Sequence, residues 1–217
     1  MPHGKRESGK RKIRTTRNMK RAKILIGLIS LILICAGFFL YEFNLKVKYH
    51  GYLLSGEKAP DFTLINHYGT ETRLSQFRGK VVLLYFGYTH CPDACPMTLS
   101  ILKESIERLQ NNRNRVQVLF ITIDPERDTI QKLRVYVPYF DKDFLGLTGS
   151  SQEIAKVAKS YNIFYQKESD VESEAGYFMT HTTSVYLINP KGKLILEYPI
   201  TDLNPEWIAE DIKRILD

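Results

Sequence analysis

Apolar residues gather into short runs along the C-terminal three-quarters of the chain, separated by turn signals. Lys80 to Phe86 (KVVLLYF) and Val116 to Ile123 are continuous apolar runs rich in β-branched residues, as expected for central strands buried on both faces. Ser184 to Ile188 and Leu194 to Tyr198 are joined by the turn sequence NPKGK, and residues 62–74 contain a second hairpin pattern around Asn66 to Gly69. These runs predict a sheet with a hairpin near each end of the domain.

Helical periodicity fills the intervals between the predicted strands. Four apolar side chains recur at helical spacing after the first buried run: Leu99, Leu102, Ile106 and Leu109. Three more helices are predicted, one opened by Asp128 with a body over 129–137, one over 151–161 and one over 205–216. Strands that alternate with helices indicate an α/β layered domain, and the closing hairpin makes its sheet mixed. The order predicts a thioredoxin-like fold with a central mixed sheet.

An uncharged segment precedes this domain. Residues 24–41 are eighteen positions without a charge, and Ser30 is the one clearly polar side chain. A helix of that length spans about 27 Å, close to the hydrocarbon thickness of a bilayer. Basic residues flank the segment on its N-terminal side and Tyr41 marks an interface on the other. The positive-inside rule therefore predicts an N-terminus in the cytoplasm and a C-terminal domain outside it.

This anchor divides the chain into a basic cytoplasmic tail (1–23), a transmembrane helix (24–41), a linker (42–58) and a folded domain (59–217). A cleaved signal peptide would have a shorter apolar core and a small-x-small cleavage site, and no such site is evident. The tail resembles an organelle transit peptide in composition, but it is short and runs straight into the anchor. We therefore expect a single-pass protein of a bacterial cytoplasmic membrane, with a periplasmic or extracytoplasmic domain.

The formal charge of +7 does not indicate a nucleic-acid-binding protein, because the excess lies in the tail. Residues 1–23 hold ten of the 31 basic residues and one acidic residue, which leaves 21 basic and 23 acidic residues, a net charge of −2, from Ile24 onward. A nucleic-acid footprint needs a basic patch on the folded surface. The polar, acidic stretch from Glu168 to Gly176 is expected to be an exposed loop.

Two thiols lie between the first buried strand and the following helix, in the sequence GYTHCPDACP over residues 87–96. Cys91 and Cys95 are four residues apart, which places them on one helix face if the helix begins there. A helix N-terminus favours thiolates, and two thiolates form a soft pair that selects Cu(I), but the same pair could form a redox-active or a purely structural disulfide. Cys35 lies within the apolar segment and is expected to have no chemical role.

A third ligand would separate a metal site from a disulfide. The candidate imidazoles are those of His50, His67, His90 and His181. His50 lies in the linker and His67 in a hairpin turn, so both are predicted to be solvated. His181 precedes the strand that begins at Ser184, and in thioredoxin-like folds that position faces the cysteine-bearing helix. A lone histidine before a strand is nevertheless more often a surface or capping residue, so the sequence pattern leaves this question open.

Three segments together resemble the SCO/SenC family: GYTHCPDACP, DPERDT over 124–129, and the late His181. The resemblance covers the chain from about Pro60 to its end. It implies a copper site, Cu(I) or Cu(II), formed by Cys91, Cys95 and His181. The acidic residues of DPERDT lie next to that site and could orient a ligand, set the local charge or guide a partner, with Asp124 as the candidate behind the ligands, while the alternative role of Asp128 is to cap a helix. His90 and Asp93 belong to the motif but are not expected to bind the metal.

The resemblance also implies a function. Such proteins assist the formation of the binuclear copper centre of cytochrome c oxidase subunit II, by delivering copper, by reducing the cysteines of that subunit, or by both. Another copper chaperone is the expected donor. A metallochaperone of this kind hands over an ion, so its status as an enzyme stays open.

Four other functions compete with this interpretation. A membrane-anchored thiol–disulfide oxidoreductase without a physiological metal would usually have CxxC and a proline where His181, Thr182 and Thr183 stand. A peroxidase would need a proline ahead of the reactive cysteine, and the residues before Cys91 supply none at that position. A zinc site would need a catalytic base that the sequence does not single out. A pure interaction module would retain its function without Cys91 and Cys95.

Overall fold

The computed structural model describes residues 23, 27–37, 48–168 and 176–217. The chain divides into two units, residues 1–48 and 49–217. In the first unit residues 27–37 are helical and exposed. Within the described part of the chain, no helix is both long enough and apolar enough to cross a bilayer. The predicted tail except Lys23 lies outside the described residues, as do residues 24–26 and 38–41 of the predicted anchor, residues 42–47 of the predicted linker and residues 169–175 of the predicted acidic loop.

Two buried parallel strands form the centre of the second unit. All seven residues of β4 (Val81–Gly87) are buried, and β4 pairs in parallel with β5 (Val116–Thr122). The eight-stranded sheet has the order β1-β10-β9-β4-β5-β6-β2-β3. Its other strands are β1 (Tyr52–Leu53), β2 (Thr63–Asn66), β3 (Glu71–Arg73), β6 (Leu145–Thr148), β9 (Ser184–Ile188) and β10 (Leu194–Pro199). Because β6 is parallel to β5 while β9 is antiparallel to β4, the prediction of a mixed sheet is confirmed.

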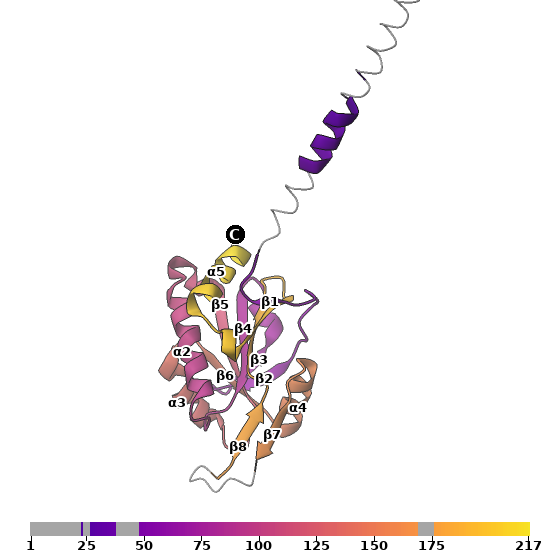
Figure 1. Cartoon of the computed structure of the whole chain (residues 1–217). Helices are drawn as coiled ribbons and strands as arrows, with labels where there is room; N and C mark the ends of the chain where they lie inside the picture. The colour runs from indigo at the N-terminus through magenta and orange to yellow at the C-terminus, as the bar shows by residue number, and fades with distance from the viewer. Residues whose placement is uncertain (1–22, 24–26, 38–47, 169–175) are drawn as a thin grey trace, which may run out of the picture. The chain divides into compact units, whose positions relative to one another are not determined.

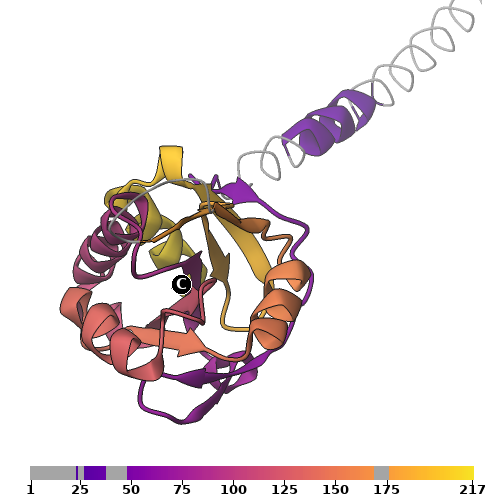
Figure 2. The same ribbon diagram turned by 90° about the horizontal axis from the view of Figure 1, so that it is seen from below.

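Helices cover both faces of this sheet. They are α2 (Ala94–Glu107), α3 (Ile130–Phe140), α4 (Ser151–Ser160) and α5 (Pro205–Leu216). Figures 1 and 2 show α2 and α3 on one face and α4 on the other, and α5 packs against α2. Side chains alternate accordingly along β4, because successive residues of a strand point to opposite faces. Tyr85 reaches Cys95 of α2, whereas the ring of Phe86 packs on Tyr161 at the end of α4.

Polar caps set the helix starts. Thr129 caps α3 by accepting a hydrogen bond from the Lys132 amide, and Ser150 caps α4 in a capping box with Glu153. Asn204 caps α5, whose first residue is a proline. The prediction that Asp128 opens or caps α3 is wrong by one residue. Thr129 is the N-cap of α3, and the Asp128 carboxylate accepts hydrogen bonds from Thr89 and Thr122 instead.

The folded unit begins before residue 59, the predicted start of the domain. Residues 52–53, which the sequence analysis places in the linker, form edge strand β1 against β10. Just before it, the backbone amides of His50 and Gly51 donate to the buried carboxylate of Asp211 in α5, at distances of 2.9–3.1 Å. These contacts make residues 49–53 part of the folded unit.

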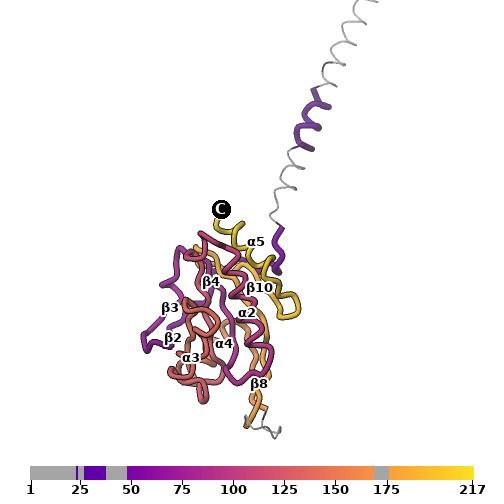
Figure 3. The backbone as a smooth tube through the Cα atoms, turned by 90° about the vertical axis from the view of Figure 1, so that its left-hand side faces the viewer, coloured from indigo at the N-terminus to yellow at the C-terminus, as the bar shows by residue number. Residues whose placement is uncertain are grey.

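A separate two-stranded ribbon, absent from the sequence prediction, consists of β7 (Tyr165–Glu168) and β8 (Phe178–His181). Figures 1 and 3 show β8 at the end of the folded unit opposite α5. Its last residue is His181, so this ribbon places one of the expected metal ligands. Strand β6 is likewise short and was not predicted.

The prediction of a solvated His67 is wrong. Its side chain is fully buried, and Nδ1 accepts a hydrogen bond from the Gly146 amide at 3.0 Å. Burial lowers the pKa of His67, so its imidazole is neutral at pH 7. The hairpin turn that contains it folds back onto the start of β6, which removes His67 from solvent.

Candidate metal centre

The two cysteines occupy different environments at the junction of β4 and α2. Helix α2 begins at Ala94, so Cys95 lies in its first turn while Cys91 lies in the loop before it. Cys95 is fully buried and Cys91 is half-buried. The Cys95 amide donates to the Cys91 sulfur at 3.4 Å, as expected for free amides at a helix N-terminus. Gly87 permits this packing, because a Cβ there would lie 2.9 Å from the Cys95 sulfur.

Opposite pKa shifts distinguish the two sulfurs. The hydrogen bond from Cys95 lowers the pKa of Cys91 to about 5, with the Asp93 and Cys95 amides and His181 contributing in the same direction. The pKa of Cys95 is raised, first by its bond to Cys91 and then by burial. The Tyr85 hydroxyl donates to the Cys95 sulfur at 3.4 Å. At neutral pH the pair therefore holds one proton, with the negative charge on the more exposed sulfur.

His181 faces this pair from the end of β8. Its Nε2 lies 4.0 Å from the Cys95 sulfur, and its Nδ1 lies 2.8 Å from the Thr182 carbonyl oxygen. A carbonyl only accepts, so Nδ1 carries the proton and donates it, which leaves the lone pair of Nε2 directed toward Cys95. Burial lowers the pKa of His181, so the ring is neutral at pH 7. A neutral imidazole with a fixed tautomer is the form that binds metals.

The three side chains fit a metal by donor type, and Cys95 and His181 come close to the separation of two ligands of one ion. With zinc-like lengths of about 2.3 Å to sulfur and about 2.1 Å to nitrogen, tetrahedral ligands lie about 3.6 Å apart. The observed 4.0 Å between Cys95 and His181 is slightly longer. Among the described residues no three His, Cys, Asp or Glu side chains are already close enough to hold an ion. Both thiols are free, and two sulfurs with one imidazole suit copper.

Asp128 fixes the loop that carries Cys91. Its buried carboxylate accepts hydrogen bonds from the Thr89 amide at 2.9 Å, the Thr89 hydroxyl at 2.5 Å and the Thr122 hydroxyl at 2.6 Å. Burial raises the pKa of Asp128 despite these donors. His90 Nδ1 lies 3.8 Å from the same carboxylate. The sequence analysis considered Asp128 as a helix cap or as one of the acidic residues beside the site, but it did not predict the contact with the Cys91 loop. The position of Asp128 in DPERDT, near Asp124, was the available signal.

Asp124 is buried and contacts the β8 side of the site. It accepts from Arg127 Nε at 2.5 Å and from the Tyr177 hydroxyl at 2.7 Å. Tyr177 immediately precedes β8, so Asp124 is connected to the strand of His181 rather than to the cysteines. Sequence reasoning missed Tyr177, which lies at the end of the acidic stretch and in none of the three family segments.

Comparison with known proteins adds an independent observation. The family model described as SCO1/SenC matches residues 53–217. The chain belongs to the SCO1/SenC family. A bovine relative, described as "Protein SCO2 homolog, mitochondrial", is 40% identical over 156 residues, which are 71% of this chain and 58% of the relative. This chain therefore matches less than two-thirds of that protein's length.

Solved structures of SCO1/SenC proteins share the fold. ScoI of Bradyrhizobium japonicum with copper bound has a TM-score of 0.67 and 34% identity, covering 74% of this chain and 100% of that one. BsSco, described as having a disulfide switch and as one of the cytochrome c oxidase assembly proteins, has a TM-score of 0.59 and 26% identity, covering 75% and 95%. The mixed α/β fold found here is thus the thioredoxin-like fold of this family.

The other three described histidines of this SCO1/SenC chain lie in other surroundings. The ring of His50 stacks on Trp207 with 5.3 Å between centroids, and its Nε2 is 2.9 Å from Glu210. His67 is buried beside β6. His90 is close to the cysteines in sequence, but its Nδ1 contacts the Thr89 hydroxyl at 3.2 Å. Among the described histidines, only His181 contacts a cysteine sulfur.

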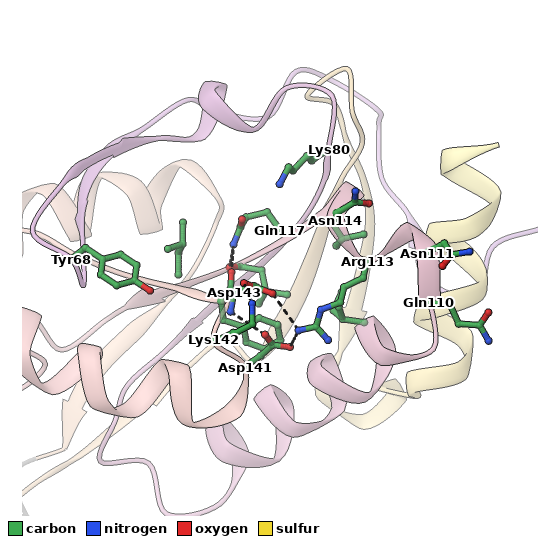
Figure 4. A pocket seen from close by; sticks show the side chains of 15 residues that line it. Tyr68, Lys80, Gln110, Asn111, Arg113, Asn114, Gln117, Asp141, Lys142 and Asp143 are labelled. Carbon is green, nitrogen blue, oxygen red and sulfur yellow. Dashed lines mark hydrogen bonds and ion pairs between the residues drawn. The ribbon is translucent and has the colours of Figure 1, made fainter.

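A cavity of about 530 Å³ lies away from the cysteines (Figure 4). Its walls include Lys80, which precedes β4, and Val116, which begins β5, whereas the cysteines follow the opposite end of β4. Within it Arg113 pairs with Asp141 at 2.5 Å and with Asp143 at 3.5 Å. The cavity therefore has no part in the cysteine–histidine site, which lies at the other end of the central strands.

Proposed function

We propose that this SCO1/SenC protein binds one copper ion through Cys91, Cys95 and His181 and uses it to assist assembly of the binuclear copper centre of cytochrome c oxidase subunit II. The observation that carries the proposal is the lone pair of His181 Nε2, directed at the Cys95 sulfur from 4.0 Å. The copper-bound ScoI and the oxidase-assembly description of BsSco support it. Asp124 binds Tyr177 beside the strand of His181, and Asp128 binds Thr89 in the loop of Cys91.

The two sulfurs have different parts in handling copper as cargo. Cys91 is half-exposed and ionised at neutral pH, so it accepts the ion from a donor, proposed to be another copper chaperone, and releases it to the target. Cys95 must lose its proton when the ion enters, and neutral His181 adds the third donor. Because binding displaces a proton from Cys95, copper affinity falls in acid.

A reductase function of the same pair is the second candidate, and the low pKa of Cys91, about 5, favours it. The Cys91 thiolate would attack a disulfide of subunit II and form a mixed disulfide. The Cys95 thiolate would then attack Cys91, releasing the second target thiol and leaving a Cys91–Cys95 disulfide. Two electrons pass to the target, and its two thiols take one proton from Cys95 and one from solvent, because Cys91 is already ionised. The disulfide switch described for BsSco is consistent with such a couple.

Two mixing experiments with subunit II distinguish copper delivery from reduction of its cysteines. In the first, at least two equivalents of copper-loaded protein meet the metal-free, reduced soluble domain of subunit II, and delivery predicts the absorption of the binuclear centre. In the second, the metal-free dithiol protein meets the oxidised subunit, and reduction predicts two new target thiols. Cys91→Ser should abolish both reactions, while Tyr139→Phe, on the exposed side of α3, should change neither. Failure of both mixtures with the wild-type protein would contradict the proposed function.

We further propose that residues 24–41 anchor the protein in a bacterial cytoplasmic membrane, with the copper site on the extracytoplasmic side. The support is the uncharged eighteen-residue segment and the basic tail before it. The full-length protein should stay in the membrane fraction after carbonate extraction, and a chain beginning at residue 42 should not. Release of the full-length protein by carbonate would contradict the anchor.

A further inference from the structure

The ribbon that carries His181 has few ties to the main sheet. Strands β7 and β8 pair with each other and with no described strand of the eight-stranded sheet. The Met179 amide donates to the Tyr88 hydroxyl at 3.3 Å, and the side chains of Tyr165 and Met179 pack against the core. The Thr182 amide donates to the Phe164 carbonyl at 2.9 Å, which joins the two ends of the ribbon only to each other. The position of His181 relative to the cysteines therefore depends on side chains that connect the ribbon to the domain.

Tyr177 provides the densest of these connections. Its hydroxyl donates to Asp124 at 2.7 Å, and its carbonyl accepts from Arg127 at 2.9 Å. The Arg127 guanidinium lies 3.5 Å from the centroid of the Tyr177 ring, and the Lys167 ammonium lies 3.8 Å from it. Both distances are well within the range of cation–π attraction. Tyr177 is thus bound to the turn after β5 through its hydroxyl, its ring and its backbone.

The same turn also contacts β7 and the neighbourhood of His181. Lys167 of β7 pairs with Glu126 at 3.3 Å, so both strands of the ribbon are joined to residues 124–127. Arg127 lies 5.9 Å from the centroid of the Tyr88 ring, and that ring packs nearly perpendicular to the His181 ring with 6.0 Å between centroids. A continuous set of contacts therefore runs from Tyr177 through Arg127 and Tyr88 to the imidazole.

We propose that Tyr177 is a positioning residue for His181: bound to Asp124 and Arg127, it holds the β7–β8 ribbon so that the imidazole stays within reach of Cys95. This inference rests on the proposed function and deepens it. Two sulfurs satisfy Cu(I), whereas Cu(II) requires the nitrogen donor more strongly. Tyr177 therefore determines how well the site holds Cu(II) and has little influence on Cu(I).

Copper titrations of the full-length protein test the inference with graded variants. Tyr177→Leu removes both the hydroxyl and the ring, and Tyr177→Phe removes the hydroxyl alone. Loss of a residue that supports a ligand typically weakens metal binding about 10- to 100-fold. We expect a Cu(II) loss of that size in Tyr177→Leu, a smaller one in Tyr177→Phe, and wild-type Cu(I) affinity in both. Tyr139→Leu, at an 84% exposed tyrosine of α3, is the matched control and should bind both ions normally.

Amide hydrogen exchange in the metal-free protein gives a second readout that does not depend on copper. The Met179 and Thr182 amides should exchange faster in Tyr177→Leu, while amides of β4 should keep their wild-type rates. If wild-type protein bound no copper, the proposed function would fail, and the exchange rates would still test the positioning of the ribbon. Wild-type Cu(II) affinity and wild-type exchange in Tyr177→Leu, beside a loss of Cu(II) in His181→Ala, would overturn the inference. Tyr177→Phe serves the same comparison if the leucine variant does not fold.

Discussion

At the scale of single residues, identical side chains differ because of where the helix begins. Cys91 and Cys95 are indistinguishable in the sequence, yet α2 starts at Ala94, so one thiol lies before the helix and the other inside it. The sequence predicts the pair and its reactivity. It does not predict which sulfur is ionised, because burial and the hydrogen bond between the sulfurs depend on the tertiary structure. For the same reason, the sequence could not show that His67 is buried whereas His181 faces a thiol.

The ionisation of Cys91 is measurable by alkylation. Because its pKa is lowered to about 5, the thiolate fraction rises through that pH and is nearly complete at pH 7, whereas an ordinary thiol ionises at about 8.5. Iodoacetamide should modify Cys91 with a rate that levels off above about pH 6 and should leave Cys95 largely unmodified. Peptide mass spectrometry separates both sites from Cys35. A Cys91 rate that still rises steeply between pH 7 and pH 9 would contradict this assignment.

Asp128 should matter for stability because its buried carboxylate accepts three hydrogen bonds. In Asp128→Asn an amide NH₂ replaces one acceptor oxygen and faces a donor, so we expect a loss of about 1–3 kcal/mol in the free energy of unfolding. Urea unfolding measures it. Asp143→Asn, at a carboxylate that is 58% exposed, is the control and should cost far less. Equal unfolding midpoints for the two variants would show that Asp128 does not hold the loop.

At the scale of elements, hydrophobic periodicity decides what the sequence can predict. The buried strands β4 and β5 and the amphipathic α5 are found close to their predicted bounds, because each carries a strong local pattern. β1 has two residues, and the ribbon strand β7 (YQKE) is mostly exposed. Neither strand has a local hydrophobic pattern: β1 forms by pairing with β10, far away in the chain, and β7 forms by pairing with the next strand, β8.

Residues 49–58 test whether a strand without a local pattern contributes to the stability of the fold. A chain that begins at residue 59 lacks β1 and the two backbone amides that bind Asp211, a carboxylate with 0% exposure. Hydrogen bonds to a charged group contribute about 1.5–3 kcal/mol each, so this chain should be at least about 3 kcal/mol less stable than one that begins at residue 49. Urea unfolding of the two chains gives the difference. Equal midpoints would mean that residues 49–58 act only as a linker.

At the scale of the whole molecule, strand pairing assembles a site from distant parts of the chain. β9 runs antiparallel beside β4, with Val185 opposite Tyr85. Residues that precede β9 therefore meet residues that follow β4, which brings His181 to the end of the sheet where Cys91 and Cys95 lie. The resemblance of the sequence to the SCO/SenC family predicted this set of three residues. The supporting contacts of Asp128, Arg127 and Tyr177 needed the three-dimensional structure, because they join segments up to 53 residues apart.

The central claim is a copper site of two sulfurs and one imidazole, and a Cu(II) titration of the reduced full-length protein tests it most directly. Wild type should form a 1:1 complex with a thiolate-to-copper absorption band. Cys91→Ala and His181→Ala should each lose that band, and Tyr139→Phe should retain it. If the wild-type protein bound no copper specifically while its Cys91–Cys95 disulfide formed and was reduced readily, the claim would be contradicted and a dedicated thiol reductase would take its place.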